Sequence, residues 1–433
     1  MSDKQVITIV GGGAAGLMAA YFAKLNHSED RVILVEKNTY LGAKVIISGG
    51  GRCNVTTGIK DVKRVLENYP RGSEFLRTAI QNFPPQAVMD WFESQDVPLK
   101  TEEDLRVFPI SNNGKDIVGA LENALKESGI EILLNSSISE IILNNENKFT
   151  LTFKDGNKLI SNKLILTTGG NAYRQTGSTG DGYAFAKNFG HSITQLSPSL
   201  ASLNSAENWS HQLTGISFNK SNLSLLDAEI PASRVGPFLF THKGITGPAT
   251  FALSAQIAHL NITPEQPLNL SIDLFPDQSI EQLDKELQTS FQNNPTKQLN
   301  NVLAFLMPHR MADTLLEQLP NLLYQIKFDQ QMLEQIDKLN LFDLTCTNIS
   351  KNLRKALVQI LKNLPLTIIG RGTGDEFVTA GGVPLTEVDS KTMQSKITPG
   401  LYFAGELLDI DGYTGGFNLQ ASWATGALAG ESV

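Results

Sequence analysis

The chain has 433 residues, of which 41% are hydrophobic and 18% charged, and its formal net charge is −8. These values are typical of a globular protein with two or three domains and a sizeable core. No block of Lys and Arg offers a cationic footprint, and no apolar run reaches the roughly 20 residues that span a bilayer. We therefore expect neither nucleic acid nor a membrane as a partner.

The two cysteines, Cys53 and Cys346, lie far apart in the sequence. They form neither a CxxC pair nor a zinc-ligand spacing, and so few cysteines are typical of a reducing compartment. We expect a cytoplasmic protein without a metal site.

The first element is a predicted strand over residues 6–10 that runs directly into the glycine-rich turn 11–16. A predicted helix over residues 14–25 follows, and then a second apolar strand over residues 31–35 that ends at Glu36. Strand, glycine turn, helix and acidic residue in this order form the dinucleotide-binding fingerprint.

Each fingerprint position has a physical role. Gly11 makes the tight turn, Gly13 lets the backbone approach a pyrophosphate, and Gly16 lets the helix pack closely on the strand. Glu36 can accept hydrogen bonds from a ribose hydroxyl, and the pyrophosphate rests on the helix N-terminus. We expect the cofactor to contact Gly11, Gly13, Ala14, Ala15, Gly16, Glu36 and Lys37.

A second glycine-rich loop follows at residues 48–54. Three successive glycines cost backbone entropy, which is typical of a backbone that passes close to a ligand. Arg52 and Lys44 can neutralise the phosphate or ring charge of a cofactor, although each can equally be a solvated surface charge. Cys53 has no neighbouring thiol, so we interpret it as a small buried residue near the cofactor. This loop contributes the candidates Lys44, Gly50, Gly51, Arg52, Cys53 and Asn54.

Helical and strand patterns alternate as far as residue 191. Apolar spacing predicts helices over 85–94 and 116–128, strands over 131–134, 138–143, 149–153 and 164–168, and a last helix that ends at Gly190.

No glycine occurs between residues 248 and 369, a stretch of 122 residues. We interpret the centre of the chain as an insertion that splits a nucleotide-binding domain. Short strands punctuated by Asn, Ser and Pro predict a β-barrel or sandwich, and short amphipathic helices follow. We expect Pro295, Pro308 and Pro320 to separate these helices, and a further helix over 352–362 to lead back.

The predicted domains are a nucleotide-binding domain, an inserted β-barrel domain and a small helical domain. They span residues 1–191 with 365–433, residues 192–274 with 341–364, and residues 275–340, respectively.

The C-terminal segment repeats the strand–glycine–helix pattern, with a strand over 401–404 and a helix from 416 to about 430. FAD is long enough to use two helix N-termini, one for its pyrophosphate and one for the electron-rich edge of the flavin ring. The candidates in this segment are Gly405, Glu406, Asp411, Gly416, Phe417, Asn418 and Leu419. The predicted fold class is α/β, a Rossmann-like, glutathione-reductase-like FAD-binding domain interrupted by a β-barrel and a small helical domain.

The sequence resembles a bacterial family of FAD-dependent, NAD(P)-linked oxidoreductases that includes aminoacetone oxidases and bile-acid-inducible flavoproteins. The resemblance extends over almost the whole chain and rests on residues 11–16, 49–54, 106–109, 240–242, 247–249, 378–383 and 405–418. One departure is Gly236-Pro237-Phe238, where the family pattern leads us to expect an acidic residue. A weaker likeness to fumarate-reductase-type flavoproteins rests on residues 179–182.

The resemblance implies FAD as the cofactor of an oxidoreductase. By analogy with flavoproteins it places the turn Thr168, Gly169 and Gly170 near the pyrophosphate or adenosine, and the strand that starts at Ile138 beside the adenine. NAD(P)H, if it is used, is expected to bind transiently, because only one glycine-rich fingerprint occurs.

Two residues are candidates for catalysis on a small-molecule substrate. His242 precedes a glycine turn, and histidine is the side chain most often used for proton transfer near neutral pH, but His242 can also be an exposed or structural histidine. Arg106 can anchor a carboxylate or donate a proton, or it can form a structural salt bridge.

Four functions stay open. The first is hydride transfer between NAD(P)H or a small substrate and another acceptor. Two other enzymatic functions are reduction of activated C=C bonds and amine oxidation that yields peroxide. A non-catalytic flavin-binding regulator is the alternative from another class. The sequence contains no indication of an oligomeric state.

Overall fold

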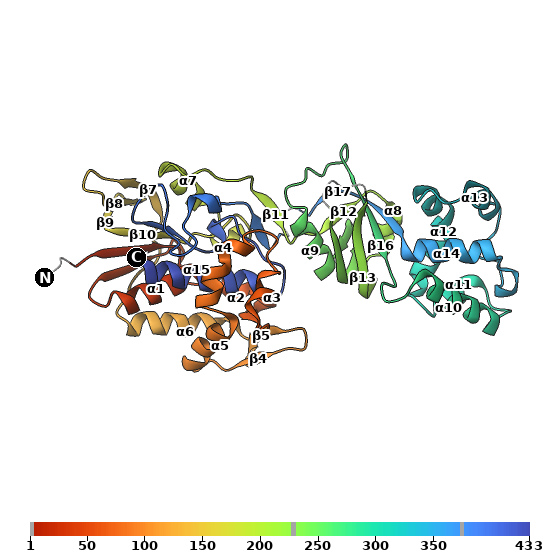
Figure 1. Cartoon of the computed structure of the whole chain (residues 1–433), viewed down its shortest axis with the longest axis horizontal. Helices are drawn as coiled ribbons and strands as arrows, with labels where there is room; N and C mark the ends of the chain where they lie inside the picture. The colour runs from red at the N-terminus through yellow and green to blue at the C-terminus, as the bar shows by residue number, and fades with distance from the viewer. Residues whose placement is uncertain (1–3, 227–230, 373–375) are drawn as a thin grey trace. The chain divides into compact units, whose positions relative to one another are not determined.

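The computed structural model describes residues 4–226, 231–372 and 376–433. The chain forms two compact units, which we describe separately. Unit 1 comprises the residues up to Ser199 and those from Glu376 onward, and unit 2 comprises the residues between them. Both ends of the chain therefore belong to unit 1, where the red and dark blue ribbons of Figure 1 lie together.

A five-stranded parallel sheet forms the centre of unit 1. Its strand order is β19 (Leu401–Phe403), β10 (Lys163–Leu166), β1 (Val6–Val10), β2 (Arg31–Val35) and β6 (Glu131–Leu133). The strands are short and apolar because a parallel sheet is covered on both faces. The N-terminal strand lies at the middle of the sheet and the C-terminal strand at its edge, which confirms the predicted Rossmann-like fold of a split domain.

Helices surround this sheet, and α1 and α15 pack closely against each other (Figure 1). The helices of unit 1 are α1 (Ala14–Asn26), α2 (Ala43–Ile47), α3 (Val62–Leu66), α4 (Ser73–Asn82), α5 (Pro85–Ser94), α6 (Gly114–Glu127), α7 (Asp181–Asn188) and α15 (Phe417–Ser432). Among these, α2, α3 and α4 were not predicted from the sequence.

Three small antiparallel sheets complete unit 1. They are β3–β5–β4, β7–β8–β9 and the two-stranded ribbon β11–β18. Their bounds are β3 (Thr56–Thr57), β4 (Leu99–Thr101), β5 (Arg106–Pro109), β7 (Ile138–Leu143), β8 (Phe149–Phe153), β9 (Lys158–Ser161), β11 (Ser197–Ser199) and β18 (Val378–Ala380). In this ribbon, β11 directly precedes unit 2 and β18 follows it.

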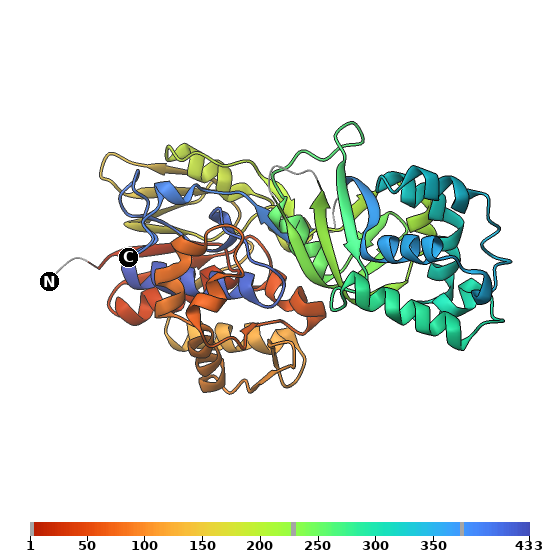
Figure 2. The same cartoon turned by 45° about the vertical axis from the view of Figure 1, so that its right-hand side comes forward.

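Unit 2 contains a closed barrel of antiparallel strands in the order β12–β15–β14–β13–β16–β17 (Figure 2). Its strands are β12 (Leu203–Ser205), β13 (Ser217–Leu226), β14 (Ser233–Thr241), β15 (Gly244–Thr246), β16 (Leu268–Asp273) and β17 (Leu364–Arg371). Alternate residues such as Leu223, Phe238 and Phe240 are buried, as expected where every second side chain points inward. The barrel confirms the predicted insertion, but β17 closes it over residues that the predicted boundary at 365 assigned to the FAD-binding domain.

Helices make up the rest of unit 2 (Figure 2). They are α8 (Asn208–Gln212), α9 (Pro248–Gln256), α10 (Ile280–Asn293), α11 (Leu299–Leu303), α12 (His309–Gln325), α13 (Gln330–Asp337) and α14 (Lys351–Lys362). Pro320 lies inside α12, so the expectation that it separates two helices was wrong. Buried leucines on both sides of Pro320 hold the helix against the core despite the missing backbone N–H.

Within the described parts of the chain, we find no helix that is both long enough and apolar enough to cross a bilayer.

Candidate cofactor site

The three fingerprint glycines occupy different environments. Gly11 has φ +110°, and a Cβ at this residue would lie 2.6 Å from the Thr167 carbonyl oxygen. A Cβ at Gly16 would lie 1.8 Å from the Gly11 carbonyl oxygen. Both positions therefore require glycine for close backbone packing. A Cβ at Gly13, by contrast, would have no atom within 4 Å, which leaves the space that a pyrophosphate needs.

The backbone around Gly13 suits an anion. Gly13 is the N-cap of α1, and the first N–H groups of a helix have no acceptor inside it. The neighbouring Gly12 N–H donates to Glu36 Oε2 at 2.6 Å, and the Asn38 N–H donates to Glu36 Oε1 at 2.8 Å. Glu36 is buried and thus fixes the turn, while its predicted bond to a ribose stays a prediction.

Lys37, the other candidate after β2, points to a different element. Its Nζ lies 2.7 Å from Asp181 Oδ2 and donates to Thr179 Oγ1 at 2.6 Å. Lys37 therefore ties β2 to the start of α7, and its charge is already compensated.

Lys44 and Glu406, which are far apart in sequence, form a salt bridge of 2.8 Å. Lys44 Nζ also lies 3.1 Å from Ser178 Oγ, and Glu406 Oε1 accepts the Thr379 N–H at 2.8 Å. A Cβ at Gly170 would lie 2.8 Å from Glu406 Oε1, so the predicted 168–170 turn lies beside this pair. The structure thus brings together three separate candidate segments around one ion pair.

The N-terminus of α15 lies beyond that of α1. A Cβ at Gly426 would lie 2.3 Å from the Ala15 carbonyl oxygen, and one at Gly430 would lie 2.4 Å from that of Ala19. The two helices therefore run parallel, with residue 425 level with the first residue of α1. Because α15 starts at Phe417, eight residues earlier, its N-terminus lies roughly 12 Å further along the common axis at 1.5 Å per residue. One helix end can bind a pyrophosphate and the other can face a flavin ring joined to it by a ribityl chain.

The residues around that second helix end hold one another in place. Gly416 has φ +90°, and a Cβ there would lie 2.3 Å from the Thr56 carbonyl oxygen. The Asn418 side chain accepts from the Gly412 N–H at 2.8 Å and donates to the Gly412 carbonyl at 2.7 Å. The Phe417 carbonyl accepts from the Tyr69 hydroxyl at 2.8 Å. These bonds fix the segment in which Gly405, Leu419 and the other C-terminal candidates lie.

Asp411 is buried in that same segment. Its Oδ2 is paired with Arg71 and accepts from Ser199 Oγ. Burial raises the pKa of Asp411, and the neighbouring Arg71 acts in the opposite direction. Asp411 is therefore bonded to protein groups through Oδ2, and its predicted contact with the cofactor stays a prediction.

The loop at residues 48–54 provides open backbone. A Cβ at Gly50 or at Gly51 would have no atom within 4 Å, and both residues have positive φ. Arg52 stacks on Phe108 with its Cζ 3.8 Å from the ring centre. Asn54 Oδ1 accepts from the Val107 N–H at 3.3 Å and joins the loop to β5.

The structure brings Arg52 and Arg106 to one carboxylate. Arg52 Nη1 lies 2.7 Å from Glu102 Oε1, and Arg106 Nη2 lies 3.4 Å from Glu102 Oε2. Arg106 is also 2.6 Å from Asp104. The salt-bridge alternative for Arg106 is therefore present, although its side chain is 41% exposed and can still meet a ligand.

Cys53 has no exposed surface. Burial raises the pKa of its thiol to about 12, and a hydrogen bond with Ser48 offsets only part of this increase. A thiol with so high a pKa is inert at neutral pH. Cys53 is a core residue here, and its side chain has no open face toward a cofactor.

Two further candidates belong to other elements. Ile138 begins β7 and is half-buried. His242 is exposed on the turn between β14 and β15 of unit 2. Its role in proton transfer stays a prediction.

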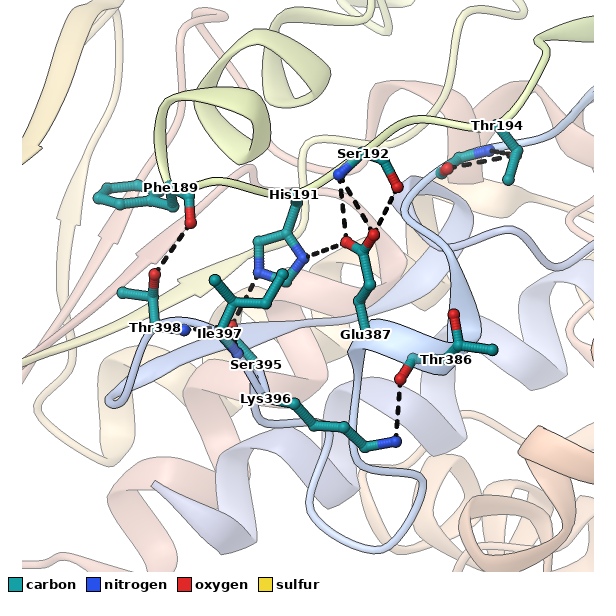
Figure 3. A network of polar contacts seen from close by, with 11 residues as sticks. Phe189, His191, Ser192, Thr194, Thr386, Glu387, Ser395, Lys396, Ile397 and Thr398 are labelled. Carbon is teal, nitrogen blue, oxygen red and sulfur yellow. Dashed lines mark hydrogen bonds and ion pairs between the residues drawn. The ribbon is translucent and has the colours of Figure 1, made fainter.

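A second polar network in unit 1 joins the chain that leads toward unit 2 with the chain that returns (Figure 3). The ring of the buried His191 lies 2.8 Å from both Glu387 Oε2 and Ser395 Oγ. Ser395 Oγ also accepts the N–H groups of Ile397 and Thr398, so its own proton points to His191 Nε2. His191 Nδ1–H consequently donates to Glu387.

The order serine, histidine and carboxylate resembles a nucleophilic triad. Ser395, however, is only 6% exposed, and its oxygen already accepts two backbone N–H groups. The network therefore joins two chain segments and is not a reactive centre.

Several contributors to the site were not predicted from the sequence. Thr379 is the middle residue of β18, just before Gly381 and Gly382, and Ser178 follows Gly177, so the neighbouring glycines were a usable signal. Arg71 gave no signal, because its partner Asp411 is 340 residues away.

Two helix N-termini offset along one axis, next to a parallel sheet, define a Rossmann-type flavoprotein. The profile of the family described as "HI0933-like protein Rossmann domain" matches residues 5–432, and the chain belongs to this family. The chain is an FAD-dependent oxidoreductase, as the resemblance predicted.

Two relatives match over the full length. The chain is 28% identical to the 3-dehydro-bile acid delta(4,6)-reductase of Clostridium scindens over 99% of this chain and 98% of that protein. It is 30% identical to the ribosomal RNA dihydrouridine synthase of Haemophilus influenzae over 100% of this chain and 99% of that protein.

Among solved structures, the chain is similar to the 3-ketosteroid-delta4-(5alpha)-dehydrogenase of Rhodococcus jostii in complex with 4-androstene-3,17-dione. The TM-score is 0.50 and the identity 12%, over 100% of this chain and 97% of the other. At this identity the likeness concerns the fold alone.

Proposed function

We propose that this protein reduces a C=C bond conjugated to a carbonyl group in an organic acceptor, with NAD(P)H as the hydride donor. The observation that carries this proposal is a chemistry common to the names of the two full-length relatives. A delta(4,6)-reductase of a 3-oxo bile acid saturates a conjugated enone, and dihydrouridine is uridine with its ring C=C bond saturated. Both products require a hydride and a proton added across an activated double bond.

The residues of unit 1 fit this chemistry. FAD, when bound, supplies two-electron transfer between a nicotinamide and a carbon acceptor. The α1 N-terminus with the open Gly13 would hold the pyrophosphate, and the Lys44–Glu406 pair would be a further polar contact for the cofactor. The α15 N-terminus presents the positive end of its dipole, which favours negative charge on the flavin ring.

The overall reaction converts NAD(P)H and a proton into NAD(P)⁺ while the acceptor gains two hydrogens. Because the sequence contains a single glycine-rich fingerprint, we expect NAD(P)H to bind transiently and leave before the acceptor is reduced. A pyridine-nucleotide donor fits the cytoplasmic location that we propose.

The proton must come from a side chain or from water. His242 and Arg106 are our candidates, since each can donate a proton or orient a carbonyl oxygen. His242 is exposed on its turn, and Arg106 is partly exposed beside its two carboxylates.

The second candidate function is reduction of uridine in RNA, which the 30% identity to a ribosomal RNA dihydrouridine synthase favours. Binding of an RNA backbone normally requires a cationic face. Residues 200–375, however, contain 13 Lys and Arg against 16 Asp and Glu. This balance leads us to prefer a small-molecule acceptor.

An anaerobic stopped-flow experiment with the FAD-loaded protein tests the proposal. NADH or NADPH should bleach the flavin absorbance, and 4-androstene-3,17-dione or 2-cyclohexenone should restore it without oxygen. Restoration by a uridine-containing RNA transcript and not by either enone would establish the second candidate. If aminoacetone reduces the flavin, and oxygen alone then reoxidises it rapidly and yields peroxide, the protein is an amine oxidase instead.

A further inference from the structure

We propose that Asp411 is a positioning residue that holds the N-terminus of α15, and with it the flavin-ring end of the site, in one geometry. The inference rests on the proposed reductase function only where turnover is the measured quantity.

Asp411 is held by two separate parts of unit 1. It is 1% exposed, its backbone forms a β-bridge with that of Arg71, and its Oδ2 is paired with the Arg71 guanidinium. The same oxygen accepts the hydroxyl of Ser199, which has no exposed surface and is the last residue of β11. One carboxylate oxygen therefore joins the α3–α4 connection to the ribbon that precedes unit 2.

The segment that Asp411 anchors leads straight into α15. The Tyr413 N–H donates to the Asn68 carbonyl at 2.9 Å, and the Tyr69 hydroxyl donates to the Phe417 carbonyl at 2.8 Å. Residues 68–71 thus bond residues 411–417 at three points. Among these contacts in the described part of the chain, only those of Asp411 also include a residue of β11, namely Ser199.

A buried ion pair is an inefficient way to stabilise a fold. Two charges lose hydration on burial, and well-packed apolar residues of similar size often stabilise a protein as much or more. A buried carboxylate that bonds two separate chain segments instead favours one arrangement of those segments. Because this pair lies six residues before the first residue of α15, we infer that the selected feature is the position of that helix end.

Turnover is sensitive to such positioning, because a displacement of about 1 Å at a reacting group costs about 100-fold in rate. FAD affinity depends mainly on the pyrophosphate contacts at α1. A change at Asp411 should therefore lower kcat while leaving the FAD dissociation constant nearly unchanged.

The test uses FAD-loaded full-length variants. Ser199→Ala removes one hydrogen bond and no charge, so we expect it to fold. It should keep the FAD dissociation constant within about twofold, alter the visible circular dichroism of the bound flavin, and lower the kcat of enone reduction about tenfold. Ser197→Ala on the same strand is the matched control, since Ser197 is also buried and has no side-chain hydrogen bond among the described residues.

A double variant separates positioning from stability. Asp411→Asn removes the negative charge that faces the Arg71 guanidinium at a buried position and should lower the melting temperature as well as kcat. Arg71→Met combined with Asp411→Leu removes both charges and should recover the melting temperature but not kcat or the flavin circular dichroism. Full recovery of kcat in the double variant, or a wild-type spectrum and kcat in Ser199→Ala, would overturn the inference.

The flavin spectrum keeps this inference distinct from the proposed reaction. If no variant reduces an enone and the wild type does not either, the proposed function fails. The circular dichroism of bound FAD in Ser199→Ala still decides whether Asp411 positions the helix end.

Discussion

Gly426 on α15 and Ala15 on α1 lie in direct backbone contact, so that a Cβ at residue 426 would lie 2.3 Å from the Ala15 carbonyl oxygen. This contact sets the offset between the two helix N-termini and therefore the distance that a bound cofactor has to bridge. Chain segments more than 400 residues apart are thereby joined in one site.

Gly426→Ala should lower the free energy of unfolding by about 1–3 kcal/mol, because the added methyl group forces two helix backbones apart. Urea denaturation of the apoprotein measures the change. Gly119→Ala on α6 is the matched control, since a Cβ there meets no atom within 4 Å. The control should be stabilised by about 0.5–1 kcal/mol through helix propensity. A loss of equal size in both variants would refute a specific contact between α1 and α15.

Gly13→Val should raise the FAD dissociation constant at least about 100-fold, which corresponds to about 2.8 kcal/mol. The variant should fold, because a Cβ at residue 13 meets no protein atom and φ is −84°. Flavin fluorescence titration measures the affinity, and the melting temperature of the apoprotein shows that the fold is intact. Gly119→Val serves as the control. Normal flavin content in Gly13→Val would contradict a pyrophosphate site at α1.

His242→Gln should keep FAD affinity and lower the rate of acceptor reduction about 100-fold, the usual effect of losing a general acid. The measurement is kcat for the enone, with the rate of flavin reduction by NAD(P)H as an internal reference. Lys243→Gln, on the same turn, should leave both rates unchanged. Equal rates in His242→Gln and the wild type would leave Arg106 or water as the proton source.

The network around His191 predicts a pH-dependent contribution of Glu387 to stability. Burial raises the pKa of Glu387, but hydrogen bonds from Ser192 and His191 outweigh this effect and leave the pKa below its ordinary value of 4.5. A lowered pKa means that the stabilisation is present above pH 4.5 and is lost as the pH falls through the folded-state value.

Thermal unfolding of Glu387→Gln and of the wild type should therefore differ at pH 7 and converge as the pH is lowered below 4.5. Glu74→Gln, which removes an exposed carboxylate of a surface pair, is the control. A constant difference across this range would show that Glu387 acts through packing and not through its charge.

The elements that the sequence predicts correctly are those with a strong local signal. The strand Val6–Val10, the glycine turn and helix α1 follow from apolar runs and glycine placement alone. Pro320 shows the limit of local signals, since tertiary packing of leucines keeps α12 continuous. Helix α9 was missed because the chain around it reads as short strands, although Gly247 and Pro248 form a common helix start.

Local sequence patterns do not predict ion pairs between residues that are far apart in the chain. The Lys44–Glu406 salt bridge and the Arg71–Asp411 pair join residues more than 300 positions apart. Both became visible only once the sheet had placed the C-terminal strand beside β10. The burial of Cys53 was predicted, because a lone cysteine among glycines has no partner thiol, but its lack of any open face was not.

Hydrogen–deuterium exchange with and without FAD tests the central claim most directly. If one cofactor spans both helix ends, FAD should protect the backbone amides of residues 14–17 and of residues 417–420 together, with the same dependence on FAD concentration. Protection of only the first segment, or of neither, would contradict the account.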